Sequence, residues 1–352
     1  MSAAVGAFLT MTGARLPIVQ APMANFAGVE LTIAALGAGG VGSLPCAVLD
    51  PEAIVEQVRA VRGAVAGPVN LNFFAHRLGS QPDDAAWRER LAPFYAAEGV
   101  GPPDTPPPLR RPFDDDACAA VEAVRPEIVS FHFGLPDERL LARVRATGAK
   151  IFGNATNVAE ARWLAERGCD AIIAQGFEAG GHAGHFLRGH RPIGLFALIP
   201  QVVDATGLPV IAAGGIADER GAAAAITLGA GAVQVGTAYL VAPESGASAV
   251  HRAALAGAGA DDSLFTNLFT GGLARGLRNG LIEKLGAIDA DAPPFPYASA
   301  ALAALKARAE NDGRGDYSNL WAGQGVGLAR AEPAVTITER LGMAALDAGT
   351  PA

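Results

Sequence analysis

Eight short apolar runs rich in Val and Ile, separated by Ala-rich stretches of helical character, most constrain how this chain can fold. Their hydrophobicity is nearly continuous rather than alternating, which is typical of parallel strands covered by helices. Eight such strands are the number that a closed (β/α)8 TIM barrel requires. We predict strands at Ile18–Ala21, Val41–Leu44, Val69–Phe73, Ile128–Phe133, Lys150–Gly153, Ala171–Ala174, Val210–Ala213 and Ala232–Val235.

The stretches between these runs carry signals for helix starts and ends. Asp or Asn, in two cases next to Pro, precedes four of them, because such side chains cap the free N–H groups of a first turn. Glycine follows several, as left-handed C-caps favour. We predict helices over Glu52–Val65, Glu138–Ala146, Val158–Arg167 and Glu219–Leu228.

The chain has 352 residues, about 100 more than a barrel of about 250 residues needs. The surplus falls in two places. An insertion at about 76–113 follows the third strand and holds a helical piece, Trp87–Tyr95, and the Pro-rich run Gly101–Pro108. After residue 260 the repeat stops, with a predicted helix at Ser299–Asn311 and a tight turn at Gly323–Gly327. We predict a barrel over residues 1–260 and a segment, 261–352, that caps its mouth.

Charge and cysteine content exclude several classes of function. The net charge of −8 offers no cationic face to a phosphate backbone, so nucleic acid is a poor candidate partner. Cys46, Cys118 and Cys169 lie far apart without a CxxC pair, which argues against a disulfide framework or a cysteine-based zinc site and favours the cytoplasm. The uncharged run Gly221–Pro243 is long enough to cross a bilayer, but its glycines and polar residues favour a helix, a turn and a buried strand, so we expect no membrane partner.

Glycines at two strand ends predict a phosphate site. Gly214-Gly215 follows the seventh strand and Gly236-Thr237 the eighth, the positions where barrels of this kind bind phosphate through backbone N–H groups. Ordinary turn glycines are the alternative in a chain with 44 of them. The run Gly37–Gly42 spells GxGxxG, but a helix precedes it and a strand follows, the reverse of a dinucleotide fingerprint, so we interpret it as a helix-to-strand turn.

Amide side chains are predicted at the same mouth. Gln20–Met23 ends the first strand and Asn72 the third, and Gln175 and Gln234 lie at the ends of later strands. Backbone groups and amides with few charges suit the edge of a flat heteroaromatic ring with several carbonyls and ring nitrogens, with Gln234 nearer the phosphate end. For Asn72 and Gln175 the alternative is a satisfied buried amide.

One histidine, His132, lies at the end of the fourth predicted strand, and others follow the sixth. The glycines of Gln175–His185 place His182 on a loop, where an imidazole can take a proton near neutral pH or hydrogen-bond a substrate oxygen. Metal binding with His185 and His190, and a structural role, are the alternatives; no regular helix aligns such ligands. We predict His182 as catalytic, no metal, His185 as a supporting or surface residue, and His132 as a pocket residue or a buried strand histidine.

Taken together, these segments resemble the nitronate monooxygenases, formerly called 2-nitropropane dioxygenases, which are FMN enzymes on a TIM barrel. The similarity covers about residues 15–330 and is strongest at Glu178–Gly184, which looks like the catalytic-histidine loop of the family and gives that role to His182. Leu320–Gly325 resembles the C-terminal signature of the first, bacterial and fungal class. Similar segments are Gln20–Met23, Asn72, Ser130–Gly134, Ala213–Ile216 and Gln234–Thr237.

The resemblance implies a flavin-dependent oxidative denitrification of alkyl nitronates, with propionate 3-nitronate among the candidates, by O2 to a carbonyl compound and nitrite, and a detoxification role. An FMN- and NADH-dependent enoyl-thioester reductase and a non-catalytic flavin-binding protein are the alternatives. A homo-oligomer is compatible with the Ala-rich helices, and Tyr297, Lys306 and Tyr317 are the late residues available for the substrate wall. The implied FMN contacts are Met23, Asn72, Gln175, Gly180, Gly181, Gly214, Gly215, Gln234, Val235, Gly236 and Thr237.

Overall fold

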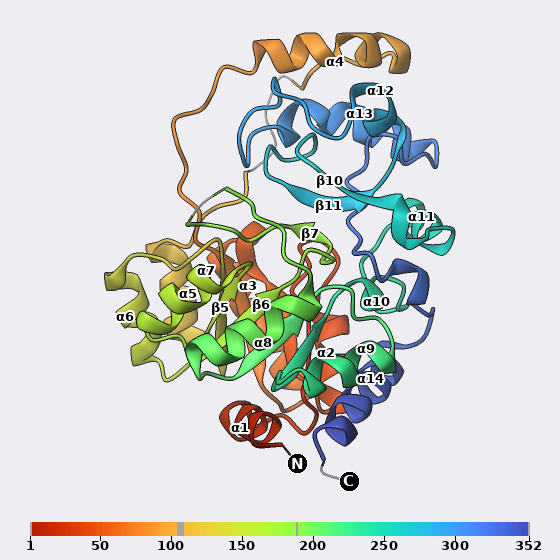
Figure 1. The fold of residues 1–352 in the computed structure, drawn as a ribbon. Helices are drawn as coiled ribbons and strands as arrows, with labels where there is room; N and C mark the ends of the chain where they lie inside the picture. Colours follow the sequence, from red (N-terminus) through yellow and green to blue (C-terminus); the bar gives the residue numbers. More distant parts are fainter. Residues whose placement is uncertain (1, 104–108, 188, 351–352) are drawn as a thin grey trace.

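The computed structural model describes residues 2–103, 109–187 and 189–350, and its centre is a closed parallel barrel (Figure 1). The eight-stranded sheet has the order β1-β9-β8-β6-β5-β4-β3-β2, and a bridge between Val19 and Val41 joins its first and last strands. Each predicted run overlaps one of these strands, with ends that differ by at most two residues, so the predicted TIM barrel is confirmed. The strands are β1 Ile18–Gln20, β2 Gly42–Pro45, β3 Val69–Phe74, β4 Ile128–His132, β5 Lys150–Ala155, β6 Ala171–Gln175, β8 Val210–Ala213 and β9 Ala232–Val235.

Helices cover the outside of the barrel, and the predicted caps start four of them. The side chains of Asp50, Asp137, Asn157 and Asp218 each accept a backbone N–H three residues on, at 2.7 to 3.0 Å. Caps of this kind stabilise a helix by about 1 kcal/mol each. The outer helices are α2 Val29–Ala38, α3 Pro51–Ala64, α5 Asp115–Val124, α6 Glu138–Ala146, α7 Val158–Glu166, α8 Leu195–Thr206, α9 Glu219–Thr227 and α14 Ala334–Ala348.

Apolar side chains seal the lower end of the barrel, and its mouth stays accessible. Val19, Ile128, Phe152 and Ile211 are buried together with Phe8 of α1 (Ala3–Thr12), which lies at the bottom of the barrel in Figure 1. Because every strand runs parallel, all their carboxyl ends meet at the opposite end, where such barrels place their sites. A ligand site is therefore expected at the mouth.

A cap covers that mouth and combines the insertion with the late segment. Helix α4 (Ala85–Glu98) of the insertion packs on α13 (Ser299–Asn311), and Tyr95 Oη donates to the carbonyl of Ala301 at 2.6 Å. Trp87 and Leu91 are fully buried in this separate core. The predicted helix Trp87–Tyr95 lies within α4, whereas residues 104–108 of the Pro-rich run lie outside the described residues. The other cap elements are α12 Gly280–Leu285 and an antiparallel sheet of β10 Ser263–Thr266, β11 Ala274–Leu277 and β7 Gly181–His182.

Helix α14 departs from the expectation that all of 261–352 caps the mouth. It packs on α2 and α9, on the wall of the barrel. The reason is its apolar face, since Ile337, Leu341 and Ala345 are fully buried in the same core as Ile18 of β1. The last helix of the chain therefore completes the barrel wall. The short helices α10 (Thr237–Leu240) and α11 (Ala249–Ala256) connect β9 to the cap.

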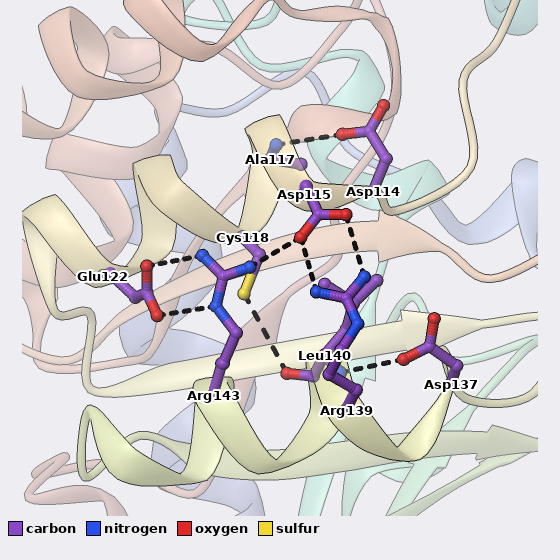
Figure 2. A network of polar contacts seen from close by, with 9 residues as sticks. All are labelled: Asp114, Asp115, Ala117, Cys118, Glu122, Asp137, Arg139, Leu140 and Arg143. Atoms are coloured by element: carbon purple, nitrogen blue, oxygen red, sulfur yellow. Dashed lines mark hydrogen bonds and ion pairs between the residues drawn. The ribbon is translucent and has the colours of Figure 1, made fainter.

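An exposed network of charges ties α5 to α6, away from the mouth (Figure 2). Arg139 binds both carboxylate oxygens of Asp115, at 2.7 and 2.8 Å, and Arg143 bridges Asp115 and Glu122. Such surface pairs add little stability individually, about 0 to 1 kcal/mol. Beneath them Cys118 is a buried free thiol, as are the other two cysteines. In the part of the chain that is described, no helix is both long and apolar enough to cross a membrane.

Candidate active site

A large cavity at the mouth of the barrel gathers all but one of the predicted site residues. It encloses about 1250 Å³, including the part open to solvent, which is ample room for a small molecule, since such sites typically hold about 300 to 1,000 Å³. Val235 is the exception: its side chain is buried in the core between barrel and helices and does not line the cavity. Lining the cavity are Met23, Asn72, His132, Gln175, Gly180, Gly181, His182, Gly214, Gly215, Gln234, Gly236 and Thr237.

One end of the cavity is built for a ligand that approaches backbone closely. Gly214 and Gly215 follow β8 with φ values of +119° and +69°, a region that side chains other than glycine rarely adopt. Thr237 Oγ1, just after β9, accepts the backbone N–H of Gly323 at 2.9 Å, which leaves the hydroxyl proton free to donate. Gln234 Oε1 is buried without a hydrogen-bond partner among the described residues. An unpartnered buried oxygen is costly unless a ligand donor meets it.

The side-chain amides of Asn72 and Gln175, nearer the centre of the cavity, make different hydrogen bonds. Asn72 Nδ2 donates to Ser130 Oγ at 2.9 Å, which fixes the amide at the cavity wall. Gln175 braces the histidine loop, because Oε1 accepts the N–H of Gly184 at 2.8 Å and Nε2 donates to the carbonyl of His182, also at 2.8 Å. Gln175 therefore acts largely as a buried amide with satisfied hydrogen bonds, which was the alternative to ligand binding. Only the second proton on its Nε2 remains free to donate to a ligand.

His182 lies on the two-residue strand β7, which pairs with β11 of the cap through His182 and Ala274. Its Nε2 is 2.9 Å from Oγ1 of the buried Thr270, whose hydroxyl donates to the carbonyl of Gly272 at 3.4 Å. The threonine oxygen thus accepts from Nε2–H. This arrangement selects one tautomer of the neutral ring and leaves Nδ1 with the free electron pair.

Aromatic side chains surround the His182 ring. The ring centroids of Phe295, Trp321, Phe74 and Phe133 lie 5.0, 5.7, 6.1 and 6.1 Å from it. Burial among them lowers the pKa of His182 well below its usual 6.5, and the positive charge of Arg110 lowers it further. His182 is therefore a neutral base at physiological pH.

The other histidines take different positions. His132 lines the cavity, and burial lowers its pKa to about 4. His185 and His190 lie with their rings 5.4 Å apart, and neither lines the large cavity. Across the described ranges, no cluster of three or more His, Cys, Asp or Glu side chains could hold a metal ion.

Three residues suggested for the substrate wall serve the cap instead. Tyr297 Oη donates to the carbonyl of Gly79 at 2.8 Å, Lys306 Nζ to Asn319 at 3.0 Å and Tyr317 Oη to Glu98 at 3.0 Å. None of them lines the cavity. Their polar atoms are used to join cap segments, which a residue type alone does not reveal.

Sequence reasoning missed Arg110, Phe74 and Thr270. Arg110 and Phe74 line the cavity, and Thr270 is hydrogen-bonded to the ring of His182. Arg110 follows the Pro-rich run, where no periodic pattern indicates which side chain turns inward. Phe74 ends β3, two residues after Asn72, and strand alternation places both on one face. That spacing was the one available signal.

The late segment around Trp321 closes one side of the site. Gln324 N donates to the carbonyl of Glu178 at 2.9 Å, next to the histidine loop, and Trp321 forms a bridge with Gly276 of β11. The predicted turn at 323–327 is present, with Val326 N donating to the carbonyl of Gly323 at 3.2 Å. The segment thus links the loops after β6 and β9.

Comparisons with known proteins find relatives over nearly the whole length of the chain. A family model described as nitronate monooxygenase matches residues 7–341. A protein of Pseudomonas aeruginosa named nitronate monooxygenase is 39% identical over 95% of this chain and 97% of its own length. A nitroalkane oxidase from Streptomyces ansochromogenes superposes with a TM-score of 0.86 at 34% identity, covering 97% of this chain and 98% of its own. FabK from Thermotoga maritima is also similar, with a TM-score of 0.75 at 26% identity over 96% of this chain and 95% of its own.

Proposed function

Because the chain belongs to the nitronate monooxygenase family, we propose that it is an FMN-dependent oxidoreductase that converts alkyl nitronates and O2 to a carbonyl compound and nitrite. The observation that carries this proposal is His182, a neutral base among aromatic rings at a deep cavity. The hydrogen bond to Thr270 holds one tautomer, so the His182 ring offers Nδ1 as its one basic nitrogen.

The residues of the cavity fit FMN. The backbone around Gly214, Gly215 and Gly236, with the Thr237 hydroxyl, would hold the phosphate, and the unpartnered Gln234 oxygen would accept from the ribityl hydroxyls. Bound FMN supplies the electron-accepting chemistry and the reaction with O2. The remaining predicted contacts, for the ring portion, are Met23, Asn72, Gln175, Gly180 and Gly181.

The chain's own residues bind the substrate, exclude water and move one proton. A neutral nitroalkane needs to lose the proton on its α-carbon, and Nδ1 of His182 is the atom that takes it. A nitronate arrives already deprotonated, so its oxidation needs no proton transfer to His182. Phe74 and Trp321, which line the cavity, limit the access of water to the reacting atoms.

Oxygen uptake and nitrite release test this proposal. The purified protein, reconstituted with FMN, is mixed with ethylnitronate or propionate 3-nitronate in air. We expect O2 consumption together with nitrite and the matching carbonyl compound, each dependent on enzyme concentration. A protein that cannot be reconstituted with FMN, or that binds FMN and consumes no oxygen with either nitronate, contradicts the proposal.

The likeness to FabK favours a second candidate, a reductase that uses NADH and FMN on an enoyl thioester. Mixing the reconstituted protein with NADH without oxygen separates the two functions. Rapid loss of the flavin colour indicates the reductase. A flavin that stays oxidised under NADH, in a protein that releases nitrite from nitronates, indicates the nitronate oxygenase.

A further inference from the structure

The described residues that line the cavity include one positively charged side chain and no negatively charged one. Among them Arg110 is the one Lys or Arg, and none is Asp or Glu. His182 is neutral, and its N–H is directed to Thr270, so this ring presents no positive charge to a substrate. His132 is neutral as well, with a pKa of about 4. The permanent positive charge of the site is therefore the guanidinium of Arg110, since arginine stays protonated.

The backbone that follows Arg110 is hydrogen-bonded to the barrel. The next residue, Arg111, donates its N–H to the carbonyl of Ala47 at 3.3 Å, and Phe113 donates to the carbonyl of Phe74, at the end of β3, at 2.8 Å. Arg110 is near enough to His182 for its charge to act on that ring. The insertion thus brings a cation to the same part of the cavity as the catalytic base.

Arg110 and its neighbour Arg111 differ in exposure and in ion pairing. The exposed Arg111 pairs with Asp114 at 2.6 Å. Arg110 is half-buried, and within the described residues no carboxylate lies within 4.0 Å of its side-chain nitrogens. A half-buried cation without a partner is costly, and an anionic ligand with two oxygens would relieve that cost through paired N–H donors.

We infer that Arg110 is a specificity-determining residue that binds the negative charge of the substrate, so that the cavity selects planar two-oxygen anions over neutral molecules of the same shape. This inference rests on the proposed function for the identity of the substrate. The nitronate group and a carboxylate elsewhere on the substrate share the required chemistry. Because His182 accepts rather than donates at Nδ1, Arg110 supplies the attraction that the histidine does not.

The test compares Arg110→Met with Arg111→Met, an adjacent arginine outside the cavity, and with Arg110→Lys. Nitrate, an unreactive planar anion, is titrated into each FMN-reconstituted protein, and its Kd is read from the change in flavin absorbance. We expect Arg110→Met to weaken nitrate binding about tenfold or more, the loss typical of a charge-assisted contact. Arg110→Lys should recover part of the affinity, and Arg111→Met should stay within about twofold of the parent.

Steady-state kinetics on two substrates then show which anionic group of the substrate Arg110 binds. A rise in KM for both ethylnitronate and propionate 3-nitronate, with kcat little changed, shows that Arg110 binds the nitronate group; a rise confined to the second shows that it binds the carboxylate. Equal nitrate affinity and equal KM values in a folded, flavin-loaded Arg110→Met protein overturn the inference. An inactive parent that still loses nitrate affinity on Arg110→Met would contradict the proposed function alone.

Discussion

At the scale of single residues, one hydrogen bond decides which nitrogen of His182 is basic. The glycine-rich loop was enough to predict His182, because the loop after a barrel strand opens onto the mouth. Thr270, 88 residues later, could not be predicted, since nothing local marks the threonine that folds back onto the ring. Its role depends on the sheet that joins β7 to β11.

Replacing Thr270 by Val tests this positioning role. The change leaves Nε2–H buried without an acceptor and removes the preference between tautomers, at a cost of about 1 to 3 kcal/mol. We expect kcat on a neutral nitroalkane to fall about tenfold or more, with a shifted acid limb in its pH profile. Thr270→Ser, which keeps the hydroxyl, should restore both. Parent-like kcat and pH profile in the valine variant would refute the assignment.

At the scale of elements, the barrel strands and helix caps were predictable, and the construction of the cap was not. Strand runs and caps such as Asp50 are encoded within a few neighbouring residues. The cap joins Trp87 and Tyr95 to residues 211 and 206 positions away, and this pairing has no local signature. The same reason explains why α14 could not be placed from its sequence.

The close approach of the histidine loop to the late segment gives a prediction for Gly180. A Cβ there would lie 2.6 Å from the N of Gly323 and 2.7 Å from the carbonyl carbon of Ala322, and both are backbone atoms. Gly180→Ala must therefore displace the segment that closes the site. We expect at least a tenfold loss of FMN affinity, measured by quenching of flavin fluorescence, corresponding to about 1.4 kcal/mol or more.

The matched control is Gly63→Ala in α3, where an added Cβ meets no atom within 4 Å. That change should leave FMN affinity unaltered and slightly stabilise the helix. An unchanged FMN affinity in Gly180→Ala would show that the loop and the late segment are not closely coupled.

At the scale of the whole molecule, several partly or fully buried histidines are neutral in the folded state. Burial lowers the pKa of His76, His132 and His251 to about 4, and that of His182 well below 6.5. The unfolded chain binds protons at these sites from about pH 6.5 downward. Above pH 6.5 these histidines are neutral in both states and do not lower the free energy of unfolding. As the pH falls from 6.5 toward the folded-state pKa values, the unfolded chain takes up protons that the folded protein does not, so the free energy of unfolding decreases.

His251 isolates one of these contributions, because it lies outside the cavity, where its Nε2–H donates to the carbonyl of Trp321 at 3.1 Å. Between pH 6 and 5 the free energy of unfolding should fall by up to about 1.4 kcal/mol per pH unit for each such histidine. In His251→Gln, which does not titrate, we expect a slope smaller by up to about that amount, measured by urea unfolding. A slope equal to that of the parent would contradict the neutral buried state of His251.

The release of nitrite by a flavin-loaded His182→Asn protein tests the central claim most directly, because it separates the base from the site that holds FMN. His182 lines the cavity but the phosphate end is formed by other loops. We predict a parent-like flavin content and visible spectrum, with turnover of a neutral nitroalkane reduced by about 100-fold or more, the range of a general base. Nitrite release at the parental rate would contradict the account.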